Sequence, residues 1–239
     1  IVAEALTVST FLFVGSYIVQ FGFALLLGLH NASRRRAGRC TMILGVTAQG
    51  ISVIVISMLA VFVFSYCLRW HPTDPWVLRV PSTYGEPWGQ WLLDLVRHFW
   101  VPFLTLTFGN FWTTAYIVEK LAWGISGEEY ITAARARGIR ERSIKYRHIA
   151  RVASPALSST VVQGIFLALW GGFIVERVFS LPGIGSLFVM GSQTYDRYVV
   201  AGVLVIVTLT FQAGLFLLDI TYGFLDPRIR VGAKAGALQ

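Results

Sequence analysis

Charged residues are scarce in this sequence. Asp, Glu, Lys and Arg together make up 13% of the 239 residues, whereas hydrophobic residues make up 55%. Soluble globular proteins carry roughly 25% charged residues, so the composition excludes an ordinary soluble domain. It indicates that most of the chain lies in lipid.

Motifs of nucleotide-binding and hydrolytic sites are missing as well. The sequence contains no Gly-x-x-x-x-Gly-Lys-Ser/Thr loop for ATP, no His-Glu-x-x-His and no Gly-x-Ser-x-Gly. The four histidines are scattered over loops and segment ends rather than grouped. We therefore expect no catalytic residue, no cofactor and no metal ion in this chain, which disfavours a membrane enzyme.

Cysteine is nearly absent. Cys40 and Cys67 lie near opposite ends of one apolar segment, which places them about 40 Å apart along a straight helix. That separation excludes a disulfide between them and a shared metal site.

Five apolar segments are each long enough to cross the hydrocarbon core of a membrane, which takes roughly 20 helical residues. They are residues 5–29, 41–68, 99–121, 156–175 and 199–224. The second segment is longer than a crossing requires, which predicts a tilted helix or one that runs on into the interface. The sequence therefore predicts an all-α membrane protein, with one transmembrane domain over residues 1–239.

The basic residues predict the orientation, because cytoplasmic loops are enriched in Lys and Arg. One side holds 15 of the 20 Lys and Arg residues: Arg34, Arg35, Arg36, Arg39, Lys120, Arg135, Arg137, Arg140, Arg142, Lys145, Arg147, Arg151, Arg228, Arg230 and Lys234. This asymmetry accounts for most of the formal charge of +8 without nucleic acid as a partner. It predicts a multi-pass protein with a cytoplasmic loop at 123–155, external loops at 69–98 and 179–197, and a cytoplasmic C-terminus. Five spans then leave Ile1 outside, so we expect a sixth span upstream in the native protein.

The cytoplasmic loop carries most of these charges and predicts two helices. Ser126 followed by Glu129 has the spacing of a capping box that starts a helix, and Gly138 suits a helix end. A second helical stretch is expected to follow, until Pro155 opens the fourth span. A basic loop that lies against anionic lipid is the alternative interpretation.

The external loop at 69–98 is rich in proline and then becomes helical in pattern. From Trp88 onward, apolar residues recur at intervals of three and four, through Trp91 and on to Phe99. This pattern is typical of an interfacial amphipathic helix, with Trp at the membrane boundary. Such a helix either leads simply into the third span or takes part in gating.

Four segments in order along the chain carry a family resemblance. Residues 130–138, YITAARARG, resemble the cytoplasmic coupling loop of ABC transporter permeases, most closely the branch that imports di- and oligopeptides or nickel. The resemblance continues in VPFLTLT at 101–107, VERVFSLPGIG at 175–185 and LDPRIR at 225–230. It covers residues 100–230 by motif and the first hundred residues by topology.

The resemblance implies the fold of a type I ABC importer permease in a prokaryotic inner membrane. The chain would form half of a translocation pathway for di- or oligopeptides or a related solute. Its partners would be a second, homologous permease subunit, two ABC ATPase subunits that bind ATP and Mg²⁺, and an extracytoplasmic solute-binding protein. The alternative from the residues alone is an ion-driven secondary transporter, which predicts ionisable groups at mid-membrane.

The resemblance and the pattern of polar residues together give three sets of candidate residues. The docking helix for the ATPase comprises Glu129, Tyr130, Thr132, Ala133, Ala134, Arg137 and Gly138, and its small alanines would let a partner approach closely. The candidates for docking the binding protein are Trp88, Trp91, Pro182 and Gly183. Gln49, Gln163 and Trp170 are candidates for the pathway, because polar groups within spans usually face a cavity. For these, and for Glu119 near a span end, the alternative is hydrogen bonding between helices, and this is the favoured interpretation for Asp219.

Overall fold

The computed structural model describes residues 2–32, 35–74 and 88–225, with the side chains at 35–37, 166–171, 218, 219 and 221–225 outside the description. Every regular element in these ranges is helical. The elements are α1 (Val2–Asn31), α2 (Arg35–Gln49), α3 (Val53–Val61), η1 (Phe62–Cys67), α5 (Trp88–Gly109), α6 (Phe111–Ser126), α7 (Glu129–Ala136), α8 (Glu141–Ser143), η2 (Ile144–Ile149), α9 (Ala150–Gly171), α10 (Phe173–Val178), α11 (Ile184–Gln193) and α12 (Arg197–Leu225). The predicted all-α architecture is therefore confirmed.

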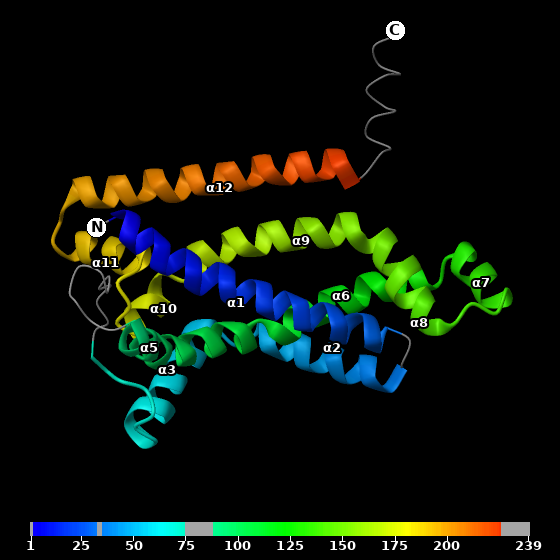
Figure 1. Cartoon of the computed structure of the whole chain (residues 1–239), viewed down its shortest axis with the longest axis horizontal. Helices are drawn as coiled ribbons and strands as arrows, with labels where there is room; N and C mark the ends of the chain where they lie inside the picture. Colours follow the sequence, from blue (N-terminus) through cyan, green and yellow to red (C-terminus); the bar gives the residue numbers. More distant parts are fainter. Residues whose placement is uncertain (1, 33–34, 75–87, 226–239) are drawn as a thin grey trace, which may run out of the picture.

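The long helices run roughly along one common axis (Figure 1). Helix α1 lies within the bundle and packs against α5, α6 and α9, while α2 packs against α6 and α12 against α9. One end of the bundle gathers the start of α1 with α10 and α11, and α7 projects from the opposite end (Figure 1). The segments predicted to be cytoplasmic that the structure describes lie at the α7 end.

Apolar side chains cover α1 all round, as expected of a helix buried in a bundle or in lipid. Leu12, Phe13 and Ala24 are fully buried against its neighbours, whereas Phe23 on another face is exposed. In the described chain, α1 and residues Arg197–Leu217 of α12 are each long and apolar enough to cross a membrane. A bent pair of helices, described next, counts as a third crossing if it is one span.

The segment 41–68 is not the single tilted helix that its length predicted. Two helical pieces, Gly38–Gln49 and Val53–Cys67, meet at an angle of 85°. Gly50 follows the first piece, and Ser52 caps the second by accepting a hydrogen bond from the amide of Ile54 at 3.3 Å. Glycine and a serine cap are ordinary helix-breaking signals, which the continuous hydrophobicity obscured. The straight-helix separation of the two cysteines therefore does not apply, although both thiols are free.

Candidate functional site

Helix α7 begins later than the sequence predicted. Ser126 is the last residue of α6, and its hydroxyl donates to the carbonyl of Trp123 at 2.7 Å. The N-cap of α7 is Glu128, whose side chain makes no capping hydrogen bond. The predicted capping box is therefore wrong, because the end of α6 already uses the hydroxyl that the box requires.

The predicted end of α7 at Gly138 is confirmed. Gly138 has a φ of +75°, in the left-handed region that only glycine adopts at little cost. Its amide donates to the carbonyl of Arg135 at 2.9 Å, and the amide of Ile139 donates to that of Ala134 at 3.3 Å. This pair of bonds is the Schellman motif, which turns the chain sharply away from the helix.

One face of α7 anchors it to the bundle. Ile131 is fully buried and Ala134 is buried beside it, in a cluster with Val118 of α6 and with Ile144 and Ile149 of η2. Ala134 therefore faces the protein, although the sequence predicted it as part of the docking surface. The hydrophobic contact fixes the position of α7 relative to α6 and η2.

The other face of α7 is open. The remaining six residues of the predicted docking set are exposed: Glu129, Tyr130, Thr132, Ala133, Arg137 and Gly138. Desolvation, and then the carboxylate of Glu128, raise the pKa of Tyr130, so its hydroxyl stays neutral and can donate a hydrogen bond. A partner would meet short side chains flanked by an aromatic ring and charged groups.

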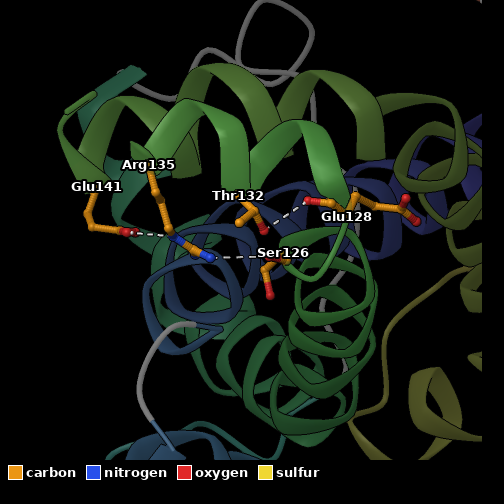
Figure 2. Close-up of polar contacts among 5 residues, drawn as sticks. All are labelled: Ser126, Glu128, Thr132, Arg135 and Glu141. Atoms are coloured by element: carbon orange, nitrogen blue, oxygen red, sulfur yellow. Dashed lines mark hydrogen bonds and ion pairs between the residues drawn. The ribbon is translucent and has the colours of Figure 1, made fainter. Parts of the chain in front are cut away.

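Arg135 of α7 forms hydrogen bonds to the segments before and after this helix (Figure 2). Its Nε donates to Oε1 of Glu141 at 2.8 Å, and another guanidinium nitrogen donates to the carbonyl of Ser126 at 3.3 Å. Both side chains of the ion pair are exposed, so the pair contributes only about 0–1 kcal/mol. From the sequence alone, Arg135 stood out only as one of the basic residues of the loop. The signal for its ion pair was the presence of Glu141 six residues later, beyond Gly138.

The second stretch of the loop is helical as predicted, but Pro155 does not open the fourth span. It lies inside α9, which begins at Ala150 and directly follows η2. Proline cannot donate to the carbonyl four residues earlier, and here the hydroxyl of Ser154 donates to that carbonyl, of Arg151, at 2.8 Å. The serine explains how the helix continues through the proline.

At the opposite end of the bundle, Glu176 joins three elements. This side chain of α10 is fully buried. Its carboxylate accepts hydrogen bonds from the hydroxyl of Ser9 in α1 at 2.5 Å and from the amides of Gly185 and Ser186 in α11 at 2.8 and 3.2 Å. The amide of Ile184 in turn donates to the hydroxyl of Ser9 at 2.8 Å. The sequence analysis did not identify this network, although Glu176 lies within the 175–185 motif.

The residues predicted to dock an external protein lie near this end and differ in accessibility. Trp88 is 66% exposed at the start of α5 and contacts Trp91 edge to face, with ring centroids 6.1 Å apart. Pro182 is half-buried, and Gly183 is buried where a Cβ atom would lie 2.2 Å from the carboxyl carbon of Glu176. Gly183 therefore has a close-packing role, whatever approaches from outside.

The pathway candidates lie on two helices, α2 and α9. Gln49 is exposed at the end of α2, where the bend begins, and Gln163 is exposed on α9. The side chains of Trp170 and Asp219 lie outside the described residues. Buried polar contacts that the sequence analysis missed tie helices instead: Gln20 of α1 donates to Thr114 of α6 at 2.7 Å.

Within the described residues, no group of three or more His, Cys, Asp or Glu side chains could hold a metal ion. The candidate site considered below is the open face of α7.

Known proteins provide an independent comparison. Residues 20–231 match the family described as "Binding-protein-dependent transport system inner membrane component". A putative peptide transport system permease protein of Brucella abortus is 30% identical over 233 residues, covering 96% of this chain and 71% of that protein. The dipeptide transport system permease protein DppB of Bacillus subtilis is 26% identical over 212 residues, or 88% of this chain and 63% of that protein. The oligopeptide transport system permease protein OppB of Salmonella typhimurium is 24% identical over 232 residues, or 96% and 71%.

Replacing Ile131 by alanine should loosen α7. The side chain is fully buried, and such a truncation costs about 2–4 kcal/mol, so the amides of α7 should exchange with deuterium roughly 30-fold faster or more. Thr132→Ala is the control on the exposed face and should leave exchange nearly unchanged. Equal exchange rates in the two variants would contradict the anchoring role of Ile131.

Replacing Glu176 by glutamine should destabilise the protein. The amides of Gly185 and Ser186 share one carboxylate oxygen, so a glutamine carbonyl can still accept from both. Its NH2 group then replaces the oxygen that accepts from the hydroxyl of Ser9, and the loss of this buried bond costs about 1–3 kcal/mol. We expect a lower thermal unfolding midpoint in detergent. The control, Glu129→Gln on the exposed face of α7, should change stability by less than about 0.5 kcal/mol. An unchanged midpoint for Glu176→Gln would show that the network carries little stability.

Proposed function

The chain belongs to the family of binding-protein-dependent transport system inner membrane components, and on this premise we propose that it forms half of a pathway for di- and oligopeptides. The resemblance to permeases of ABC importers of the peptide branch is confirmed by the family match and the relatives. The chain is thus a membrane-embedded transport subunit. This reading is favoured over an ion-driven secondary transporter, and ATP hydrolysis belongs to other subunits of such an importer.

The observation that carries the coupling proposal is the geometry of α7. This helix projects from one end of the bundle (Figure 1), presents six of seven candidate docking residues to solvent, and is anchored by Ile131. A helix with one open face and one buried face can receive a push from a partner and pass it to α6 and η2. We assign the open face to an ABC ATPase subunit, which places this end of the bundle and the C-terminus in the cytoplasm.

The remaining partners follow from the family. A second permease subunit would complete the pathway, and its own docking helix would engage the second ATPase. An extracytoplasmic binding protein would deliver the solute at the Glu176 end, near the exposed Trp88. Peptide is the proposed cargo because the relatives are named as peptide, dipeptide and oligopeptide transport permeases.

Cross-linking tests the docking surface directly. Cys40 and Cys67 are first replaced by serine, because both are exposed. Ala133→Cys, on the open face of α7, should then form a cross-link to a co-purifying ATPase chain of the complete transporter. Ala201→Cys, exposed near the start of α12 at the other end, is the matched control. Cross-linking from position 201 but not 133, or the absence of any ATPase chain from the purified complex, would contradict the proposal.

Replacing Gly138 by valine should uncouple ATP hydrolysis from transport. A β-branched residue is strained at φ +75°, so the turn after α7 should change while membrane insertion continues. We expect the stimulation of hydrolysis by loaded binding protein to be lost. Gly127→Val is the control, because Gly127 has a φ of −87° and a Cβ there would make only an ordinary contact, 3.7 Å from the carbonyl oxygen of Gly124. Normal stimulation in Gly138→Val would count against α7 as the coupling helix.

A further inference from the structure

A cavity of about 910 Å³ lies at the α7 end of the bundle, between the membrane helices and the coupling loop. Its lining comes from the end of α1, the start of α2, the last turns of α6 and the loop residues Arg135, Glu141 and Lys145. The exposed docking residues Thr132 and Ala133 are not part of the lining. The cavity is therefore distinct from the open face of α7.

Positive charge predominates in the lining. Arg39, Lys120, Arg135 and Lys145 contribute four cations, against the carboxylates of Glu119 and Glu141. Arg135 is paired with Glu141, and Lys145 donates one hydrogen bond to the carbonyl of His30 at 3.1 Å. Arg39 and Lys120 are exposed, and in the part of the chain that the structure describes neither forms an ion pair. Two cations thus remain available for an anionic ligand.

An apolar wall adjoins these cations. Trp123 and Met42 line the cavity and are 69% and 51% exposed, and Tyr116 of α6 also lines it. The exposed apolar surface continues along α2 through Ile43 and Val46. A free phosphate or a soluble anion would leave this wall unused, whereas the acyl chains of a lipid would cover it.

The position along the bundle fits the same ligand. The cavity lies where predicted spans 5–29 and 99–121 end and where span 41–68 begins, at the boundary between hydrocarbon and water. Tryptophan is enriched at that boundary, and basic pockets between membrane helices on the cytoplasmic side suit anionic headgroups.

We propose that this cavity binds one anionic phospholipid of the cytoplasmic leaflet, with its phosphate held by Arg39 and Lys120 and its chains against Trp123, Met42 and α2. Such a lipid would fill the space between α6 and the coupling loop. The proposal goes beyond transport itself and rests only on the orientation proposed above. A site of this kind can fail while the ATPase still docks on α7, so the two proposals are separable.

Site-resolved fluorescence quenching tests the lipid. The complete transporter is placed in phosphatidylcholine nanodiscs with small amounts of brominated phosphatidylglycerol or brominated phosphatidylcholine. The difference between the native protein and Trp123→Phe isolates the emission of Trp123. We expect the anionic lipid to quench this emission at a several-fold lower mole fraction than the zwitterionic lipid. Equal quenching by the two lipids would overturn the proposal.

Charge variants show whether the preference comes from this cavity. Each basic residue near the headgroup is worth up to about a fivefold preference, so Arg39→Gln with Lys120→Gln should abolish the several-fold preference expected of the native protein. Arg142→Gln with Arg151→Gln is the matched control, since both residues are exposed at the same end and outside the lining. An unchanged preference in the first pair, or an equal loss in both pairs, would show general attraction to the membrane surface and no specific site.

Native mass spectrometry gives a readout that does not depend on Trp123. The purified complex should retain phosphatidylglycerol in preference to phosphatidylcholine, and the Arg39 and Lys120 double variant should lose that preference. Retention must persist in an excess of inorganic phosphate. Complete displacement by phosphate would identify a site for a free anion and would contradict the lipid.

Discussion

A bilayer offers no hydrogen-bond partners, so a membrane protein must satisfy the ends and breaks of its helices with its own groups. This constraint explains several of the polar contacts in the described residues. The hydroxyl of Ser52 accepts from an amide after the break in segment 41–68, and the hydroxyl of Ser154 donates to the carbonyl that Pro155 leaves without a donor. The carboxyl group of Glu176 accepts from two amides in the first turn of α11. Glu176 forms the most extensive of these hydrogen-bond networks, because it joins α1, α10 and α11 in one buried network. Apolar packing alone would not fix the angles of the short helices α10 and α11 relative to α1.

The two ends of the bundle are held together by different interactions. The Glu176 end is held by hydrogen bonds to a buried carboxyl group inside the protein, which are directional and costly to break when buried. His71 adds to this end, because it is buried edge to face against Phe179 with ring centroids 5.6 Å apart. Burial also lowers the pKa of His71, so its imidazole stays neutral there. The α7 end is held by Ile131 in an apolar cluster and by a surface ion pair that contributes little.

The sequence predicted the features that depend on local pattern. Gly138 marked the end of α7 because a left-handed position has one common occupant, and the scarcity of charge indicated a membrane protein. It did not predict features that depend on contacts between distant residues. The bend of 85° was missed for a different reason: its break signals, Gly50 and Ser52, are local, but a continuous apolar run concealed them. The capping box at Ser126 failed because its residues also suited the end of α6, and only the packing of Ile131 shows where α7 begins.

Under the proposed function, recognition of the ATPase and transmission of its movement would depend on different faces of α7. Recognition by a partner depends on the open face, where side chains are short and the backbone lies near the surface. Transmission would depend on the buried face, since α7 packs in one apolar cluster with Val118 of α6 and with Ile144 and Ile149 of η2, which leads into α9. The π-helical turn η2 runs directly into α9 without a loop, so a displacement of α7 cannot be absorbed between them. The ion pair of Arg135 with Glu141 is exposed and contributes too little free energy to transmit such a displacement. Under the proposed function, apolar packing, which requires no fixed geometry of charges, is therefore the contact through which coupling would pass.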